Sequence, residues 1–318
     1  MKTLLNSNAI LAAFGAAALF GASTPFAKLY VGELSAVLLA GLLYLGSGTG
    51  LLTLRLLRDR GWRPTGLVRA RWPWLLAAIV CGGVLGPTLL MLGLARMSAA
   101  SASLLLNLEG VLTAVIAWLV FREHTNRRMV IGMAFVSLGA LLLSWPNGSL
   151  SAGAAVSGAA LLLGACLCWA LDNNLTRHVS EADALFLAGV KGISAAAVNI
   201  GLALASGQPM PQPGVLAPVL LIGFLGYGLS LALFVLALRQ LGTARTGAYF
   251  SAAPFFGAAI AIGVFRESTT PLFWLASLLM MLGLWLHLTE RHEHPHWHGE
   301  LQHSHPHYPD IEHRHEHR

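Results

Sequence analysis

Three ionisable side chains, Glu109, Asp172 and Lys191, lie inside long apolar runs of the sequence. A charged group near the centre of a bilayer costs roughly 2.5–3.5 kcal/mol on insertion scales, so each is a candidate site residue. Glu109 lies about nine residues into its run, close to mid-bilayer at 1.5 Å per helical residue. Two functions fit it: a protonatable switch and a contact for a substrate amine. A neutral, hydrogen-bonded carboxyl that tightens helix packing is the structural alternative.

Asp172 and Lys191 lie at matching depth on two consecutive apolar runs. Opposite charges at the same depth can pair, which lowers the cost of burying both. The pair is either a structural ion pair or part of a gate or substrate contact, and the sequence leaves both open.

Aromatic and amide side chains surround these charges in the sequence. Trp169 lies three residues before Asp172 and therefore shares its helical stripe, while Asn173 adds an amide beside it. An aromatic ring over amides suits a polar organic solute. Three further polar residues in apolar runs are either substrate contacts or interhelical hydrogen-bonding groups: Asn107, Tyr227 and Tyr249.

The end of the chain is rich in histidine and is interrupted by Pro295, Pro306 and Pro309. This pattern predicts a disordered tail over 290–318. Neutral imidazoles on a flexible chain can gather around Zn, Ni, Co or Cu. An affinity tag or a pH-sensitive charge cluster is the alternative interpretation. The candidate metal ligands are His292, His294, His296, His298, His303, His305, His307, His313, His315 and His317.

Other site chemistries are missing from the sequence. No Gly-x-x-x-x-Gly-Lys-Ser/Thr nucleotide-binding pattern occurs, and Gly46 and Gly50 inside an apolar run indicate a helix-packing face instead. No nucleophile motif has a partnered base, so we expect no catalytic residue and no enzyme. The three cysteines, all in apolar runs, indicate neither a disulfide framework nor a zinc site. We therefore expect no required cofactor, and transport would run on an ion or solute gradient.

The elements that hold these residues follow from composition. The chain has 318 residues, of which 56% are hydrophobic and 11% are charged, whereas soluble domains carry about 25% charged residues. So apolar a chain argues against nucleic-acid binding, despite its net charge of +6. Long, continuously apolar runs indicate helices and not a barrel. Ten runs are long enough to cross a bilayer: 9–29, 35–55, 74–95, 100–120, 129–146, 154–176, 184–205, 215–238, 244–264 and 271–289.

Lys and Arg are distributed unevenly between the two sides of this arrangement. With both ends inside, the inner segments before the tail hold 13 of them, the outer segments hold 3, and Lys191 lies within a span. The positive-inside rule therefore places both termini in the cytoplasm. We expect a multi-pass protein of the cell's inner membrane.

The sequence also contains an internal repeat. Phe121-Arg122-Glu123 recurs 144 residues later as Phe265-Arg266-Glu267, and the same offset places Gly110 opposite Pro254. Five spans per half are an odd number, so the second half must enter the membrane inverted, as in many secondary transporters. We expect one five-helix repeat over 1–146, a second over 147–289, and the tail over 290–318.

The chain resembles the EamA-like permeases of the drug/metabolite transporter superfamily. The residues that carry the resemblance are Leu108-Glu109-Gly110-Val111-Leu112-Thr113-Ala114, ending in Phe121-Arg122-Glu123, and Ala253-Pro254-Phe255-Phe256-Gly257-Ala258, ending in Phe265-Arg266-Glu267. Where the family shows Glu-Pro, Gly110 replaces the Pro and, in the second copy, Ala253 replaces the Glu. The resemblance covers 9–289 and implies an all-α protein of ten transmembrane helices in two inverted repeats. It does not specify the substrate.

The leading hypothesis is a secondary permease that exports a small organic metabolite by alternating access. The alternatives are a divalent-metal exporter or metal-responsive permease served by the tail, and a membrane-anchored metal sensor. The expected partners are the lipid bilayer, a small-molecule substrate and divalent metal ions. Nucleic acid is not among them, and the chain is expected to be a monomer or homodimer.

Overall fold

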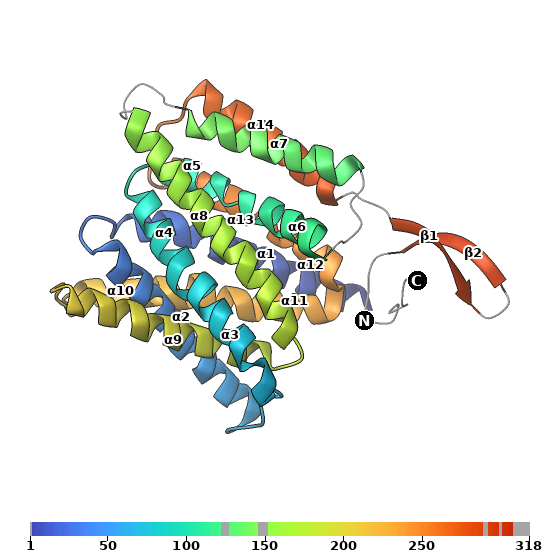
Figure 1. The fold of residues 1–318 in the computed structure, drawn as a ribbon, viewed down its shortest axis with the longest axis horizontal. Coiled ribbons are helices and arrows are strands. Elements are labelled where there is room, and N and C mark those ends of the chain that lie inside the picture. The colour runs from blue at the N-terminus through green and yellow to red at the C-terminus, as the bar shows by residue number, and fades with distance from the viewer. Residues whose placement is uncertain (1, 122–126, 146–151, 289–291, 299–300, 308–318) are drawn as a thin grey trace.

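The computed structural model describes the chain except for residues 1, 122–126, 146–151, 289–291, 299–300 and 308–318. The described membrane region is helical (Figure 1). Nine of its segments are long and apolar enough to cross a bilayer, and 271–286 forms a shorter tenth. The all-α class and the multi-span architecture predicted from the sequence are confirmed.

The first half runs up to Ser144 and contains two interrupted spans. The third span changes from α-helix to π-helix and back, and the fourth breaks at Leu106-Asn107. The elements are α1 (Lys2–Lys28), α2 (Ala36–Asp59), η1 (Arg69–Arg71), α3 (Trp72–Ala78), η2 (Ile79–Leu85), α4 (Gly86–Leu94), α5 (Ala99–Leu105), α6 (Leu108–Phe121) and α7 (Arg127–Ser144).

The second half has interruptions in the corresponding spans. The eighth span contains a second π-helical segment, and the ninth breaks at Ser251-Ala252 before Pro254. The elements are α8 (Ala152–Thr176), η3 (Arg177–Val179), α9 (Ala184–Ala205), α10 (Pro213–Gly223), η4 (Phe224–Leu229), α11 (Ser230–Leu241), α12 (Thr243–Phe250), α13 (Ala253–Gly263) and α14 (Pro271–Leu288).

Close helix packing depends on small residues, as expected where no hydrophobic force drives helices together in lipid. Gly48 of α2 and Gly192 of α9 approach so closely that neither position has room for a Cβ atom. Gly46 faces the backbone of Leu220, and Gly50 faces the ring of Phe224. The interpretation of Gly46 and Gly50 as packing residues is therefore correct. The helices α7 and α14 pack together at one edge of the bundle (Figure 1).

The N-terminus and the β1–β2 hairpin lie on the same side of the bundle (Figure 1). We call this side the terminal face; it also carries the segments 60–71 and 177–183. The opposite face carries 29–35, 95–98, 206–212 and 264–270.

Part of the tail backbone forms two strands, and the disorder predicted for the tail as a whole stays a prediction. β1 (His292–His298) pairs antiparallel with β2 (Leu301–His307). Proline cannot donate to a strand ladder, but Pro295 and Pro306 belong to ladder pairs two residues apart, Pro295–Ser304 and Glu293–Pro306. In an antiparallel ladder, pairs that exchange backbone hydrogen bonds alternate with pairs that do not. These two pairs are therefore of the same kind, and both prolines can occupy non-hydrogen-bonded pairs, where no N–H is needed. The tail side chains, and His313, His315 and His317, lie outside the described part of the structure.

Candidate functional site

The predicted pairing of Asp172 with Lys191 is present in the structure. Lys191 Nζ lies 2.6 Å from Asp172 Oδ2 and 2.8 Å from Oδ1, and the Thr176 hydroxyl donates to Oδ1 at 3.0 Å. Asp172 is buried between α8, α9 and η2. Gly82 of η2 lies so close that a Cβ atom there would overlap the Asp172 carboxylate. Because residue 82 is a glycine, the backbone of the third span can pack directly against the Asp172–Lys191 pair.

The π-helical segment η2 also leaves one backbone carbonyl without a helical partner. The Gly86 N–H donates to Cys81 O, one residue further back than in an α-helix. The next donor in that register would be residue 87, which is proline and has no N–H. The Gly82 carbonyl instead accepts from the Tyr44 hydroxyl at 2.9 Å and from Trp169 Nε1 at 3.0 Å.

Glu109 forms a second polar contact between the halves of the chain. Asn173 Nδ2 donates to Glu109 Oε1 at 2.9 Å and lies 3.4 Å from the Thr113 hydroxyl. Glu109 lies in the first turn of α6, where the helix dipole favours a negative charge. Through these two contacts, polar side chains of α6 and α8 meet inside otherwise apolar helices.

Tyr227 of η4 borders the same region. Its ring centroid lies 5.7 Å from that of Tyr44 and 5.8 Å from that of Phe20. We call the following set the central polar cluster: Tyr44, Glu109, Trp169, Asp172, Asn173, Lys191 and Tyr227. It draws on α2 and α6 from the first half and on α8, α9 and η4 from the second.

Two of the predicted site residues lie elsewhere. Asn107 donates to Leu104 O at 2.9 Å and lines a cavity of about 50 Å³ that also borders Gly132 and Gly283. Tyr249 packs on Phe14 with ring centroids 4.9 Å apart. Tyr44 is a cluster residue that sequence reasoning missed. Its hydroxyl inside an apolar run was the available signal, and its partner carbonyl could not be read from the sequence.

Within the part of the chain that the structure describes, no group of three or more His, Cys, Asp or Glu side chains could hold a metal ion. The tail histidines are not included in that statement. The central polar cluster combines carboxylate, ammonium, amide, indole and phenol groups, which can form hydrogen bonds and ion pairs.

On the opposite face, Glu267 joins the two halves. Its carboxylate accepts from the backbone N–H groups of Ala99 at 2.9 Å and Ala100 at 2.8 Å, at the start of α5. Lys28 donates to the carbonyls of Leu94 and Met97 beside it. Glu267 belongs to the repeated Phe-Arg-Glu motif, which in the sequence indicates a repeat and not this contact.

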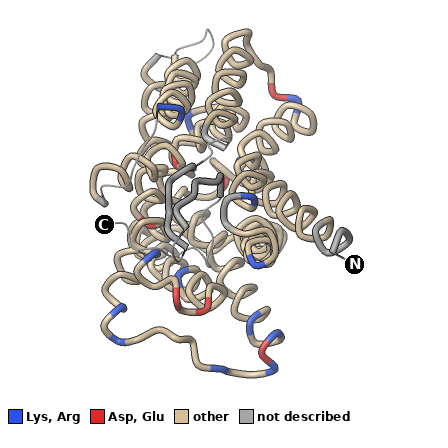
Figure 2. The backbone as a smooth tube through the Cα atoms, turned by 90° about the vertical axis from the view of Figure 1, so that its right-hand side faces the viewer, with Lys and Arg blue, Asp and Glu red and all other residues tan. Residues whose placement is uncertain are grey.

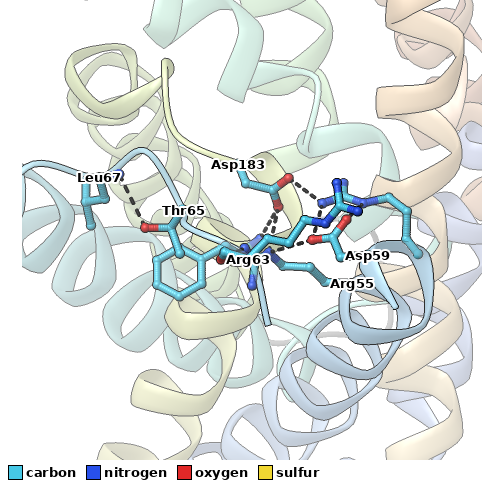
Figure 3. A network of polar contacts seen from close by, with 8 residues as sticks. Arg55, Asp59, Arg63, Thr65, Leu67 and Asp183 are labelled. Atoms are coloured by element: carbon cyan, nitrogen blue, oxygen red, sulfur yellow. Dashed lines mark hydrogen bonds and ion pairs between the residues drawn. The ribbon is translucent and has the colours of Figure 1, made fainter. Parts of the chain in front are cut away.

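On the terminal face, an ion-pair network joins α2 to the start of α9 (Figure 3). Arg58 Nη2 lies 2.6 Å from Asp183 Oδ2, and Arg55 Nε lies 3.3 Å from Asp183 Oδ1 and 3.7 Å from Asp59. Asp183 also caps α9 by accepting from the Phe186 N–H at 2.9 Å. Burial alone would raise the pKa of Asp183. The hydrogen bonds from Arg58 and Phe186 and the charges of Arg58 and Arg55 outweigh burial and lower that pKa below its ordinary value.

The chain is similar to a transporter and to a solved structure along most of its length. An uncharacterized transporter of Methanothermobacter thermautotrophicus is 26% identical over 281 residues, which cover 84% of this chain and 82% of the relative. A solved crystal structure has the same fold, with a TM-score of 0.64 at 19% identity, over 87% of this chain and 94% of its own.

A shorter relative matches only part of the chain. It is a Pseudomonas aeruginosa protein named "Probable 4-amino-4-deoxy-L-arabinose-phosphoundecaprenol flippase subunit ArnE", 37% identical over 34% of this chain and 95% of its own length. The model of the EamA-like transporter family matches residues 7–145 and again 156–289. The chain therefore belongs to the EamA-like transporter family and is a multi-pass membrane transporter.

Proposed function

We propose that the protein is a secondary transporter that exports a small polar organic metabolite by alternating access between two inverted halves. The observation that carries this proposal is the central polar cluster. The cluster contains three ionisable side chains in apolar spans: Asn173 of the second half bonds Glu109 of the first, and Lys191 pairs with Asp172 within the second half. Polar groups at the interface of two repeats are the expected substrate site in this architecture.

The two π-helical segments support the inverted-repeat part of the proposal. In η2 the shifted hydrogen bond runs from Gly86 to Cys81, and in η4 it runs from Ser230 to Leu225. Both donor and acceptor differ by 144 residues, the offset that aligns the repeated Phe-Arg-Glu motif. π-helical segments are rare and concentrate at functional sites. Their recurrence beside one cluster favours a duplicated structural device.

The packing of the interrupted spans supports a conformation that is closed at the opposite face. There α5 packs against α13, and Glu267 bonds across the contact. Toward the terminal face, α6 packs mainly on α8, and α12 packs on α1 and α11. Among the described residues, α6 and α12 have at most marginal contact. A solute would then enter from the terminal face, which the arginine distribution predicts to be cytoplasmic.

The test is a transport screen with purified protein in vesicles, using a library of amino acids, amines, nucleosides and sugars. We expect flux of one class of polar solute, and we expect Glu109→Gln to remove its dependence on a proton gradient. Tyr249→Phe is the matched control, because Tyr249 lies away from the cluster and should leave flux unchanged. A Glu109→Gln protein that keeps full proton-coupled flux would contradict the switch role of Glu109.

The metal hypothesis is tested in the same vesicles with the full chain and a form that ends at Glu290. Loss of Zn²⁺, Ni²⁺ or Co²⁺ flux with the tail would favour a metal exporter. Solute flux that is unaffected by the truncation would favour the metabolite permease. Absence of any flux in both forms would leave only the sensor hypothesis.

A further inference from the structure

The end of α2 and the segment that joins it to α3 form the most basic stretch of the chain. Residues 55–71 hold six arginines and one acid, Asp59. Figure 2 shows basic positions along the lowest loop of the backbone tube. The segment lies on the terminal face, where α2 and α8 end and α3 and α9 begin. Its arginines fall into two groups according to what they contact.

The first group is already neutralised by protein carboxylates. Arg55 is 1% exposed, contacts Asp59 and Asp183, and donates to Arg63 O at 2.7 Å (Figure 3). Arg58 binds Asp59 and Asp183. Arg71 lies 3.0 Å from Glu181 and donates to His178 O. These three side chains hold the segment against the start of α9.

The second group forms no ion pair among the described residues. Arg60, Arg63 and Arg69 are exposed, and in the residues that the structure describes none of them has an acidic side chain within ion-pair distance. Three unpaired guanidinium groups on one short segment form a patch that is complementary to anions. Guanidinium also suits phosphate oxygens because its N–H groups form a planar fork.

Exposed aromatic and aliphatic side chains accompany these arginines. Trp62 is 68% exposed, Trp72 is 39% exposed and Trp74 is 41% exposed. Val68 is 55% exposed between them. Tryptophan favours the headgroup level of a bilayer, where its amphipathic ring meets both apolar and wet surroundings. An apolar and basic surface at this level fits a lipid headgroup better than a soluble anion.

The backbone of the segment is held so that these side chains stay outside. Thr65 O accepts from the Asp183 N–H at 2.9 Å. The guanidinium carbon of Arg55 lies over the Trp62 ring, 5.0 Å from its centroid, and the Phe186 ring is nearly perpendicular to Trp62 with centroids 6.0 Å apart. The anchored residues alternate with the unpaired arginines, so the segment presents Arg60, Arg63 and Arg69 away from the bundle.

We propose that residues 60–74 form a docking surface for anionic phospholipid, with Arg60, Arg63 and Arg69 binding headgroup phosphates and Trp62, Trp72 and Trp74 lying at the same depth in the headgroup layer. The surface is separate from the central polar cluster and does not depend on which solute is transported.

The first experiment measures lipid retention by native mass spectrometry. Full-length protein is mixed with equal amounts of phosphatidylglycerol and phosphatidylcholine, and the ratio of the two bound lipids is determined. We expect enrichment of phosphatidylglycerol that decreases with added salt. In the triple variant Arg60→Gln/Arg63→Gln/Arg69→Gln, the enrichment of phosphatidylglycerol should fall by roughly five-fold for each arginine removed, at low ionic strength.

The matched control removes equal charge elsewhere on the terminal face. Arg127→Gln/Arg128→Gln/Arg239→Gln should keep the enrichment. An equal loss in the control, or full enrichment in the first variant, would overturn the proposal. Inorganic phosphate that displaces the bound lipid at equal concentration would also overturn it, since the patch would then be a site for soluble anions.

A second experiment measures depth. Phosphatidylglycerol brominated near the headgroup end of its acyl chains should quench a fluorescence component that is missing in Trp62→Phe. Bromine near the chain ends should quench that component less. Equal quenching by both lipids, or none by either, would contradict the headgroup position.

Discussion

Asp172 and Lys191 bind each other inside the membrane region, so a mutation of one leaves the other charge without its partner. Removing one member of a buried pair costs about 3–5 kcal/mol, whereas replacing both can be nearly neutral. We therefore expect Asp172→Asn and Lys191→Met each to lower thermal stability in detergent. The double variant Asp172→Asn/Lys191→Met should recover most of it.

Transport by the double variant then separates the two roles that the sequence left open. A folded double variant with wild-type flux would show a purely structural pair. A folded double variant without flux is the outcome we expect, because the pair belongs to the central polar cluster. The wild type and the double variant are compared by thermal unfolding and by vesicle flux, so that a folding defect is not mistaken for a transport defect.

Asp183 makes a pH-dependent contribution to stability on the terminal face. Its pKa in the folded protein lies below the ordinary value for Asp. Its ion pairs therefore stabilise the fold fully at pH values above that ordinary pKa, and this stability is lost as the pH falls through the folded pKa. We expect unfolding temperatures measured from pH 7 down to pH 3 to fall more steeply for the wild type than for Asp183→Asn. Asn is as good an N-cap as Asp, so this variant removes the charge and keeps the cap of α9.

Asp183→Ala provides the comparison for the cap. It removes both the charge and the cap. At pH 7 it should therefore unfold at a lower temperature than Asp183→Asn, because a lost N-cap lowers the free energy of unfolding by roughly 0.5–2 kcal/mol. Parallel pH profiles for the wild type and Asp183→Asn would show that Asp183 does not stabilise the fold through its charge.

The residues that could be predicted from the sequence are those whose type conflicts with their surroundings. Glu109, Asp172 and Lys191 are charges in apolar runs, and their depths could be counted along a helix. Asn107 and Tyr249 were equally conspicuous but face other contacts, because helix rotation cannot be counted from one sequence. Tyr44 and Glu267 were missed as site residues, since their partners are backbone groups of distant elements.

At the scale of elements, the span positions followed from apolar length, but the π-helical segments did not. Glycines 82, 83 and 86 and Pro87 mark a weak helix in the sequence without specifying a shifted hydrogen-bond register. The close contacts of these segments can be tested. We expect Gly82→Ala and Gly226→Ala each to lower stability by about 1–3 kcal/mol, because a new Cβ atom would overlap Asp172 or Ser23.

The control for this prediction is Gly201→Ala in α9. A Cβ atom there meets no heavy atom within 4 Å, and alanine is favoured over glycine in a helix by about 0.5–1 kcal/mol. Gly201→Ala should therefore be neutral or stabilising in the same thermal assay. Gly82→Ala as stable as Gly201→Ala would mean that the third span can move away from Asp172 at little cost.

At the scale of the whole molecule, the two halves are in contact at both faces but through different chemistry. Four charged side chains form the terminal-face network, while the contact at the opposite face is a carboxylate on two backbone N–H groups. The terminal-face network joins α2 and α9, which also pack along their length through Gly48 and Gly192. The contact made by Glu267 joins the interrupted spans, and under the proposed alternating access we expect its release to open a path to the cluster.

Release of that contact should be visible as access to Ser103, which is 1% exposed and lies against Gly257 beneath Glu267. In a chain whose three cysteines are replaced, Ser103→Cys should react slowly with a membrane-impermeant thiol reagent applied at the opposite face. A hydrogen bond to a charged group contributes about 1.5–3 kcal/mol, so adding Glu267→Gln should raise the rate by roughly ten-fold. Glu33→Gln, which changes an exposed carboxylate on the same face, should leave the rate unchanged. Equal rates with and without Glu267→Gln would mean that packing of α5 on α13 alone keeps this face closed, and that Glu267 fixes the start of α5 without controlling access.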